Sequence, residues 1–115
     1  MQTKNTENLG GSNPKTINEL FDQKYGAKGT KSREDFEQRA DAYMVAELVK
    51  ESRIKHRLSQ IDLAQRMKSS QSRIAKIEAG DPSVSLDLIV RALIASGATT
   101  RDIQVAFTTN ERMAG

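Results

Sequence analysis

The chain has 115 residues, of which 37% are hydrophobic, 29% charged and 4% aromatic, with a formal net charge of +3. This balance is typical of one small helix-rich domain, and it excludes base stacking on aromatic platforms as a main binding mode. Because the sequence lacks cysteine and has His56 as its single histidine, it predicts no disulfide and no metal site. The apolar runs are too short for a membrane span and the N-terminus lacks a signal-peptide core, so we expect a cytoplasmic protein.

Residues 1–31 are predicted to form an N-terminal tail with one short helix. The segment 1–15 is rich in Gly, Asn, Ser and Thr and has no apolar period. Thr16 can cap a helix that carries Ile17, Leu20 and Phe21 on one face. This helix has few apolar residues, which favours a segment that folds onto a partner.

Residues 32–109 are predicted to form one domain built of short helices. Ser32 and Asp35 resemble a capping box that opens a longer helix, which either reaches to about Arg57 without interruption or is broken near its middle. Three or four further helices are expected, because residues suited to cap them recur at close spacing: Ser59, Ser70, Ser85 and Thr99. The last element, Ile103–Phe107, fits either a helix or an alternating strand, and residues 110–115 are expected to be a disordered C-terminal tail.

Positive charge is concentrated in the middle of the chain. Between Arg53 and Lys76 there are seven Lys or Arg residues and one acid, Asp62, whereas residues 33–52 carry six acids and three bases. A basic block within a structured region is typical of phosphate contact. The alternative is a solvated helical face that happens to be basic.

Two short helices, Gln60–Lys68 and Gln71–Ala79, are separated by a turn too short for an antiparallel hairpin. They must therefore cross steeply. Ala64 is small enough for the close approach of the two backbones, and Ile74 and Ile77 can fill the angle between the helices.

These residues resemble the phage-repressor-type (Cro/CI, or XRE) helix-turn-helix family. The likeness rests on the motifs Leu58-Ser-Gln-x-x-Leu-Ala and Ser70-Gln-Ser-Arg-Ile-Ala-Lys-Ile-Glu-x-Gly80, and it covers roughly Val45–Gly97. It implies an all-α fold, a small helical bundle with the helix-turn-helix of the lambda-repressor-like DNA-binding fold. Lys68 departs from the pattern, since the family usually has at this position a turn glycine with positive φ.

The resemblance also implies which residues touch a double-stranded DNA operator. Gln71 would enter the major groove, where a glutamine can pair with adenine, and Gln60 would hold a backbone phosphate. Arg53 and Glu78 would form a partly buried structural ion pair. The DNA-binding residues implied in this way are Gln60, Ser70, Gln71, Ser72, Arg73, Lys76 and Arg57.

The N-terminal segment adds a second resemblance. The motifs Leu20-Phe-Asp-Gln-Lys-Tyr-Gly26, Lys28-Gly-Thr and Arg33-Glu-Asp-Phe36 resemble the extension of HigA-type antitoxins. This implies a transcriptional regulator that binds a small ribonuclease toxin of the HigB/RelE type through Ile17–Tyr43 and represses its own operon. The alternatives are a free-standing phage- or stress-type repressor and a protein-only adaptor.

Neither catalysis nor a cofactor is predicted. No set of nucleophile, base and orienting group is recognisable, so we expect a protein that is not an enzyme. Because one helix-turn-helix touches few base pairs, a homodimer on a two-fold operator is expected. Its contact surface is predicted within Leu86–Phe107, with Leu88 or Phe107 as contacts.

Overall fold

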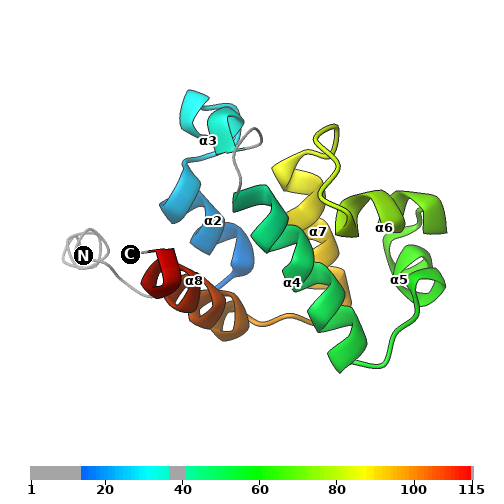
Figure 1. Cartoon of the computed structure of the whole chain (residues 1–115). Helices are drawn as coiled ribbons and strands as arrows, with labels where there is room; N and C mark the ends of the chain where they lie inside the picture. The colour runs from blue at the N-terminus through cyan, green and yellow to red at the C-terminus, as the bar shows by residue number, and fades with distance from the viewer. Residues whose placement is uncertain (1–13, 37–40, 115) are drawn as a thin grey trace, which may run out of the picture.

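The computed structural model describes residues 14–36 and 41–114, and their regular structure is entirely helical. Figure 1 shows short helices packed into a bundle, with α5 and α6 together at one end of the molecule and α2 and α8 toward the other. The helices are α2 (Ile17–Tyr25), α3 (Lys31–Phe36), α4 (Asp41–Lys55), α5 (Gln60–Met67), α6 (Gln71–Glu78), α7 (Leu86–Ser96) and α8 (Thr100–Ala114).

The N-terminal ends of most helices follow the predicted caps. In each case the capping hydroxyl accepts a hydrogen bond from the backbone N–H three residues on, which satisfies a donor that has no partner within the helix. At Ser59 the capping box is complete, because the Asp62 carboxylate accepts in return from the Ser59 N–H. The caps of this kind are Thr16, Ser59, Ser70, Ser85 and Thr99.

The structure has two helices, α3 and α4, in the segment for which the sequence left open one long helix or a helix broken near its middle. α3 begins at Lys31, one residue before the predicted cap. The hydroxyl of Thr30 accepts from the Arg33 N–H at 3.4 Å, so Thr30 takes the capping role predicted for Ser32. Residues 37–40, between the two helices, lie outside the described residues.

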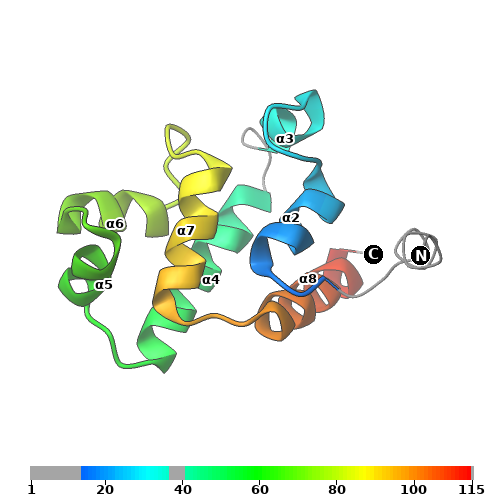
Figure 2. The same cartoon turned by 180° about the vertical axis from the view of Figure 1, so that it is seen from behind.

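The core lies between α4 and α7, which run side by side through the centre of the bundle in both views (Figures 1 and 2). α5 and α6 pack against one end of this pair. All of these helices direct their apolar face into a single cluster, whose fully buried members include Val45, Val49, Leu63, Ile74, Ile77, Leu86 and Leu93. Burial of this shared apolar surface is the main force that orders such short helices.

The N-terminal helix α2 is part of the same core. Phe21 and Tyr25 of α2 meet Phe107 of α8, and the three ring centroids lie 5.6 to 6.0 Å apart. The boundary predicted at residues 31 and 32 therefore does not separate two hydrophobic cores. Residues 1–13 of the predicted tail lie outside the described residues.

Arg33 fastens the N-terminal segment to the rest of the bundle. Its side chain is buried, and one guanidinium nitrogen donates to Asp22 Oδ1 at 2.7 Å and to the Gly26 carbonyl at 2.9 Å. The other terminal nitrogen donates to Asp87 Oδ1, at the start of α7, at 2.6 Å. A single cation thus joins α2 and α3 to α7, whose Asp87 lies 54 residues further along the chain.

The C-terminal element is a helix, which resolves the two readings of Ile103–Phe107. α8 continues to Ala114, so residues 110–114 belong to this helix and not to a tail. No glycine or proline interrupts that stretch, which explains its continuation. Phe107 is buried against α2 and Leu88 is partly buried against the core, so the prediction of Phe107 as a dimer contact is wrong.

None of the helices in the described part of the chain combines the length and apolar character needed to cross a membrane.

Candidate nucleic-acid interface

α5 and α6 form the steeply crossed pair that the sequence predicts. Ala64 is buried at the crossing, where its small side chain lets the two backbones approach. Ile74 and Ile77 of α6 are fully buried beneath α5. The turn between the helices needs only Lys68, Ser69 and the cap Ser70. This packing leaves the N-terminal turn of α6 at the surface.

The side chains on the outer face of α6 are exposed. Gln71, Ser72 and Arg73 occupy its first turn, and Lys76 follows one turn later on the same side. Ser70 is also exposed, but its hydroxyl accepts from the Arg73 N–H at 3.2 Å and lies 3.3 Å from the Ser72 hydroxyl. The Ser70 hydroxyl therefore caps α6 in the structure, although the resemblance also implies that this residue contacts DNA.

A chain of hydrogen bonds links the start of α6 to the end of α4. Gln71 Nε2 donates to Gln60 Oε1 at 3.3 Å, and Gln60 Nε2 donates to Glu78 Oε1 at 3.1 Å. Glu78 in turn accepts from Arg53 through both of its oxygens, at 2.6 and 3.1 Å. We call these four residues the glutamine relay. It connects α4, both ends of α6 and the first residue of α5.

The ion pair within the relay is well enclosed. The side chains of Arg53 and Glu78 retain only 12% and 5% of their accessible surface. The hydrogen bonds that Arg53 donates to Glu78 raise the pKa of Arg53, and this effect outweighs the opposing effect of burial. Arg53 also donates to the Leu58 carbonyl at 2.9 Å, which ties it to the chain between α4 and α5. The fork geometry of an arginine suits this bridging position.

Two residues at the edge of the interface have positive φ without being glycine. Lys68 ends α5 with φ 55°, at the position where the resembled family has its turn glycine. Arg57, two residues beyond the end of α4, has φ 59°. In both cases the following N–H donates to the carbonyl five residues before it, from Leu58 to Arg53 and from Ser69 to Ala64. This is the hydrogen-bond pattern that closes a helix with a left-handed residue.

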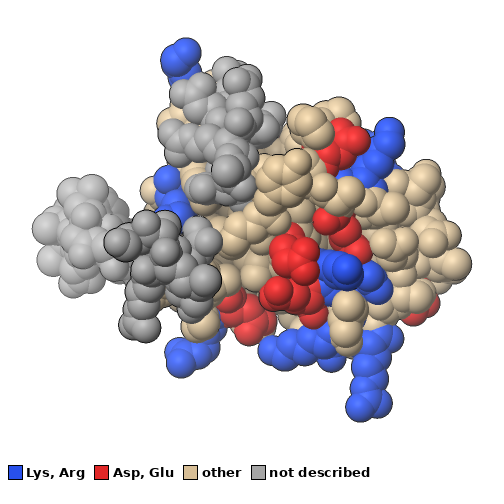
Figure 3. All heavy atoms as spheres, viewed as in Figure 1, with Lys and Arg blue, Asp and Glu red and all other residues tan. Residues whose placement is uncertain are grey.

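Charge is distributed unevenly around the interface. Figure 3 shows acidic side chains gathered over the middle of α4 and basic side chains projecting near its C-terminal end. Arg57 is exposed at that end and makes no ion pair with the described residues. Within the described part of the chain there is no group of three or more side chains suited to hold a metal ion.

The sequence-based assignment missed two features of this site. It did not foresee that Gln60 and Gln71 contact each other, because their proximity depends on the crossing angle of α5 and α6. It also missed the positive φ of Arg57, since an arginine carries no signal for a left-handed backbone. The capping residue Ser59 indicated that a helix starts there, but it did not specify the backbone conformation of Arg57.

The fold and this site define a small all-α helix-turn-helix protein. Residues 49–95, from within α4 to the last turn of α7, match the family model described as Helix-turn-helix. The matched residues include both helices of the interface described above. Searches of the curated proteins and of the solved structures find no match to this chain.

Proposed function

We propose that this protein is a sequence-specific transcription regulator that reads an operator with the first turn of α6. The observation that carries the proposal is the glutamine relay, because it orients Gln71 at the exposed start of a helix before any ligand is present. An interaction that is fixed in advance loses less conformational entropy when a ligand binds.

The hydrogen bonds of Gln71 leave it competent to read a base. Its Nε2 carries two hydrogens, of which one is donated to Gln60, and its Oε1 makes no hydrogen bond with the described residues. The second hydrogen and the free oxygen match the N7 acceptor and the N6 donor of adenine in the major groove. Gln71 can therefore contact an adenine without breaking the relay.

The residues around Gln71 are suited to contact the DNA backbone. Gln60 starts α5, so its second Nε2 hydrogen and the free N–H groups of the helix start can face a phosphate. Three exposed cations are available nearby: Arg73 and Lys76 on α6, and Arg57 just beyond the end of α4. Contacts of this kind set the position of the protein but carry little sequence information.

The proposal is tested by gel-shift titrations with the DNA upstream of the gene and random DNA as competitor, at two salt concentrations. Gln71→Ala should lose roughly 1–3 kcal/mol of discrimination at one base pair. Lys76→Ala should weaken binding to all sequences and reduce the salt slope by about 1. Gln65→Ala, a glutamine exposed on the same two-helix unit, is the matched control and should change neither quantity.

If wild-type protein shows no preference over random DNA, or if Gln71→Ala weakens binding equally on every sequence, the assignment of Gln71 as the reading residue is wrong.

We further propose that the protein binds its operator as a homodimer through a groove between α4 and α8. The groove has a volume of about 230 Å³, and Val105 in it is 54% exposed. It contains two acids, Glu51 and Asp102, and two bases, Lys55 and Arg101. In a two-fold contact a surface meets its own copy, so a patch that carries both signs of charge is complementary to itself.

The dimer is tested by sedimentation equilibrium. Val105→Glu should shift the wild-type dimer toward monomer. Ile61→Glu, which places the same charge at another exposed apolar position on α5, should leave it unchanged. A wild-type protein that stays monomeric at about 100 μM would contradict the proposed contact.

The resemblance to HigA-type antitoxins supports a finer proposal: the protein neutralises a small ribonuclease toxin and represses its own operon. The apolar side chains of α2 are buried in the core, so a toxin would have to contact the outer face of Ile17–Tyr43, where Tyr43 is exposed. Co-expression with the product of a neighbouring gene should yield a stable complex with loss of ribonuclease activity. If no neighbouring gene encodes such a toxin, the alternative of a free-standing repressor is favoured.

A further inference from the structure

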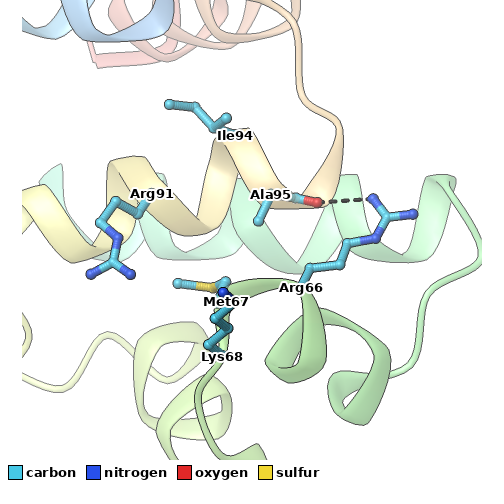
Figure 4. Close-up of a pocket in the computed structure, with 6 residues that line it drawn as sticks. All are labelled: Arg66, Met67, Lys68, Arg91, Ile94 and Ala95. Carbon is cyan, nitrogen blue, oxygen red and sulfur yellow. Dashed lines mark hydrogen bonds between the residues drawn. The ribbon is translucent and has the colours of Figure 1, made fainter.

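A groove outside the proposed DNA and dimer surfaces lies between the end of α5 and the outer side of α7. Its volume is about 310 Å³, which is at the small end of the range for ligand sites. Figure 4 shows that Met67 points toward the Arg91 guanidinium across the groove and that Lys68 lies beside Met67. The residues that line it are Arg66, Met67, Lys68, Arg91, Ile94 and Ala95.

The charge of the groove is one-sided. Three of its six lining residues are cations and none is acidic. Arg66 donates to the Ala95 carbonyl at 3.0 Å, at the C-terminal end of α7, and so has a structural partner. Lys68 and Arg91 are exposed, and neither has a hydrogen-bond or ion-pair partner among the described side chains. Their charges are free to meet an anion.

The same groove offers apolar surface beside these cations. Ile94 is 48% exposed, although isoleucine side chains are usually buried in folded domains. Met67 forms the deeper part of the groove, and its flexible thioether can adapt to ligands of different shape. A ligand that only carried charge would leave this apolar surface in water.

We propose that this groove binds a small organic anion, a carboxylate or phosphate attached to a short apolar chain. The Arg91 guanidinium can form two parallel hydrogen bonds to a carboxylate or phosphate, and Lys68 adds a second charge beside it. The apolar chain lies along Met67 and Ile94. The volume of the groove limits the ligand to the size of a short-chain acid.

Such a ligand would also act on the proposed reading helix. Lys68 is the turn residue two positions before Ser70, the cap of α6, whereas Arg91 belongs to α7. An anion held by both would join the turn to α7 and change how freely α6 is oriented. This regulatory part rests on the proposed DNA binding, whereas binding of the anion does not.

The test is an NMR titration of the full-length ¹⁵N-labelled protein at low ionic strength with hexanoate and hexyl phosphate as probes, and acetate and hexanol as comparisons. We expect saturable shifts of the Met67, Lys68, Ile94 and Ala95 amides. At least one of the two probes should bind at least about tenfold more tightly than acetate, because each buried methylene contributes about fourfold.

The double variant Lys68→Gln, Arg91→Gln should lose this binding at least about tenfold, and hexanol should not bind. All altered side chains are exposed, so the variant should fold.

The charge-matched control is the double variant Lys28→Gln, Lys31→Gln, whose altered side chains are exposed and lie outside the groove and which should bind the probes like the wild type. Equal affinity for acetate and for both six-carbon probes would mean an adventitious ion only and would overturn the proposal. So would the absence of shifts with both probes up to about 10 mM, a concentration well above that at which useful ligands bind. If the groove variant instead lowers the salt slope of DNA binding with no ligand present, its cations contact DNA phosphate and the effector site does not exist.

Discussion

At the scale of single residues, the most unusual feature is the pair of basic residues that lie just beyond the ends of α4 and α5. Arg57 and Lys68 adopt the left-handed backbone, which costs an L-residue with a Cβ atom roughly 1 kcal/mol. Their places could have been taken by glycine, as at Gly80 and Gly97, which also have positive φ beyond the ends of α6 and α7. A basic side chain at a helix C-terminus recovers part of this cost by facing the negative end of the helix dipole.

We therefore expect Lys68→Gly to raise the free energy of unfolding by up to about 1 kcal/mol, because glycine adopts this backbone without strain. The comparison is Lys50→Gly, at an exposed position within α4, which should lower it by about 1 kcal/mol. Urea denaturation followed by circular dichroism measures both. A destabilised Lys68→Gly protein would mean that the lysine side chain has a role in folding that outweighs its backbone strain.

The left-handed backbone was predictable from the sequence at Lys68 but not at Arg57. Lys68 occupies a position at which the resembled family has glycine, so the expectation of a special backbone followed from the resemblance. The same resemblance placed Arg53 opposite Glu78, and the structure has this ion pair at 2.6 Å. Arg33 gave no such signal. Its partners Asp22 and Asp87 are 11 and 54 residues away, and no local pattern announces a contact over that separation.

At the scale of the helix, the ends were predictable because capping is local. Ser59 with Asp62 and Thr99 with Asp102 needed only three residues of spacing to be recognised, and both reciprocal pairs are present. The sequence from Lys31 to Lys55 did not decide between one helix and two, since neither glycine nor proline lies within it. Helix propensity alone does not separate α3 from α4; the packing of α3 against α2 is a tertiary contact that no local pattern indicates.

The capping carboxylates predict how stability depends on pH. Hydrogen bonds from the Ser59 N–H and hydroxyl hold the pKa of Asp62 below its ordinary range, and the Thr99 N–H does the same for the pKa of Asp102. A carboxyl whose pKa is lower in the folded state stabilises the fold above its unfolded pKa and loses this effect as the pH falls through the folded value. The loss should begin below about pH 4.

We expect Asp62→Asn to lower Tm by a few degrees at pH 7, and the gap to the wild type to close as the pH is reduced from 4 to 2. Thermal unfolding at pH 7, 4, 3 and 2 measures this. A gap of the same size at every pH would show that the carboxylate charge does not contribute to the cap.

At the scale of the whole molecule, the N-terminal segment and the helix-turn-helix form one structure. The aromatic contact of α2 with Phe107 and the bridge from Arg33 to Asp87 join them on two sides. The two parts look separate in the sequence because their compositions differ, and because the resemblance to known repressors covers only roughly Val45–Gly97. Long-range packing of this kind does not show in a local pattern.

One cooperative unfolding transition is the expected result. In a Tyr43→Phe background Tyr25 is the only tyrosine and the chain has no tryptophan, so its fluorescence reports on α2. The urea midpoints from this signal and from circular dichroism should coincide. A lower midpoint for Tyr25 alone would contradict a shared core.

Arg33→Ala should lower the free energy of unfolding by about 2 kcal/mol. This is less than the loss for a fully enclosed ion pair, because both aspartates are half exposed.

The contact between α2 and Phe107 also bears on how such proteins can be recombined during evolution. An N-terminal segment joined by a linker can be gained, lost or exchanged without altering the domain it precedes. This one cannot, because its removal would leave Phe107 and neighbouring apolar surface of α8 exposed and Asp87 without its cation. Relatives that lack the segment should therefore carry a smaller or polar residue at position 107, so that loss of the segment and substitution at this position occur together.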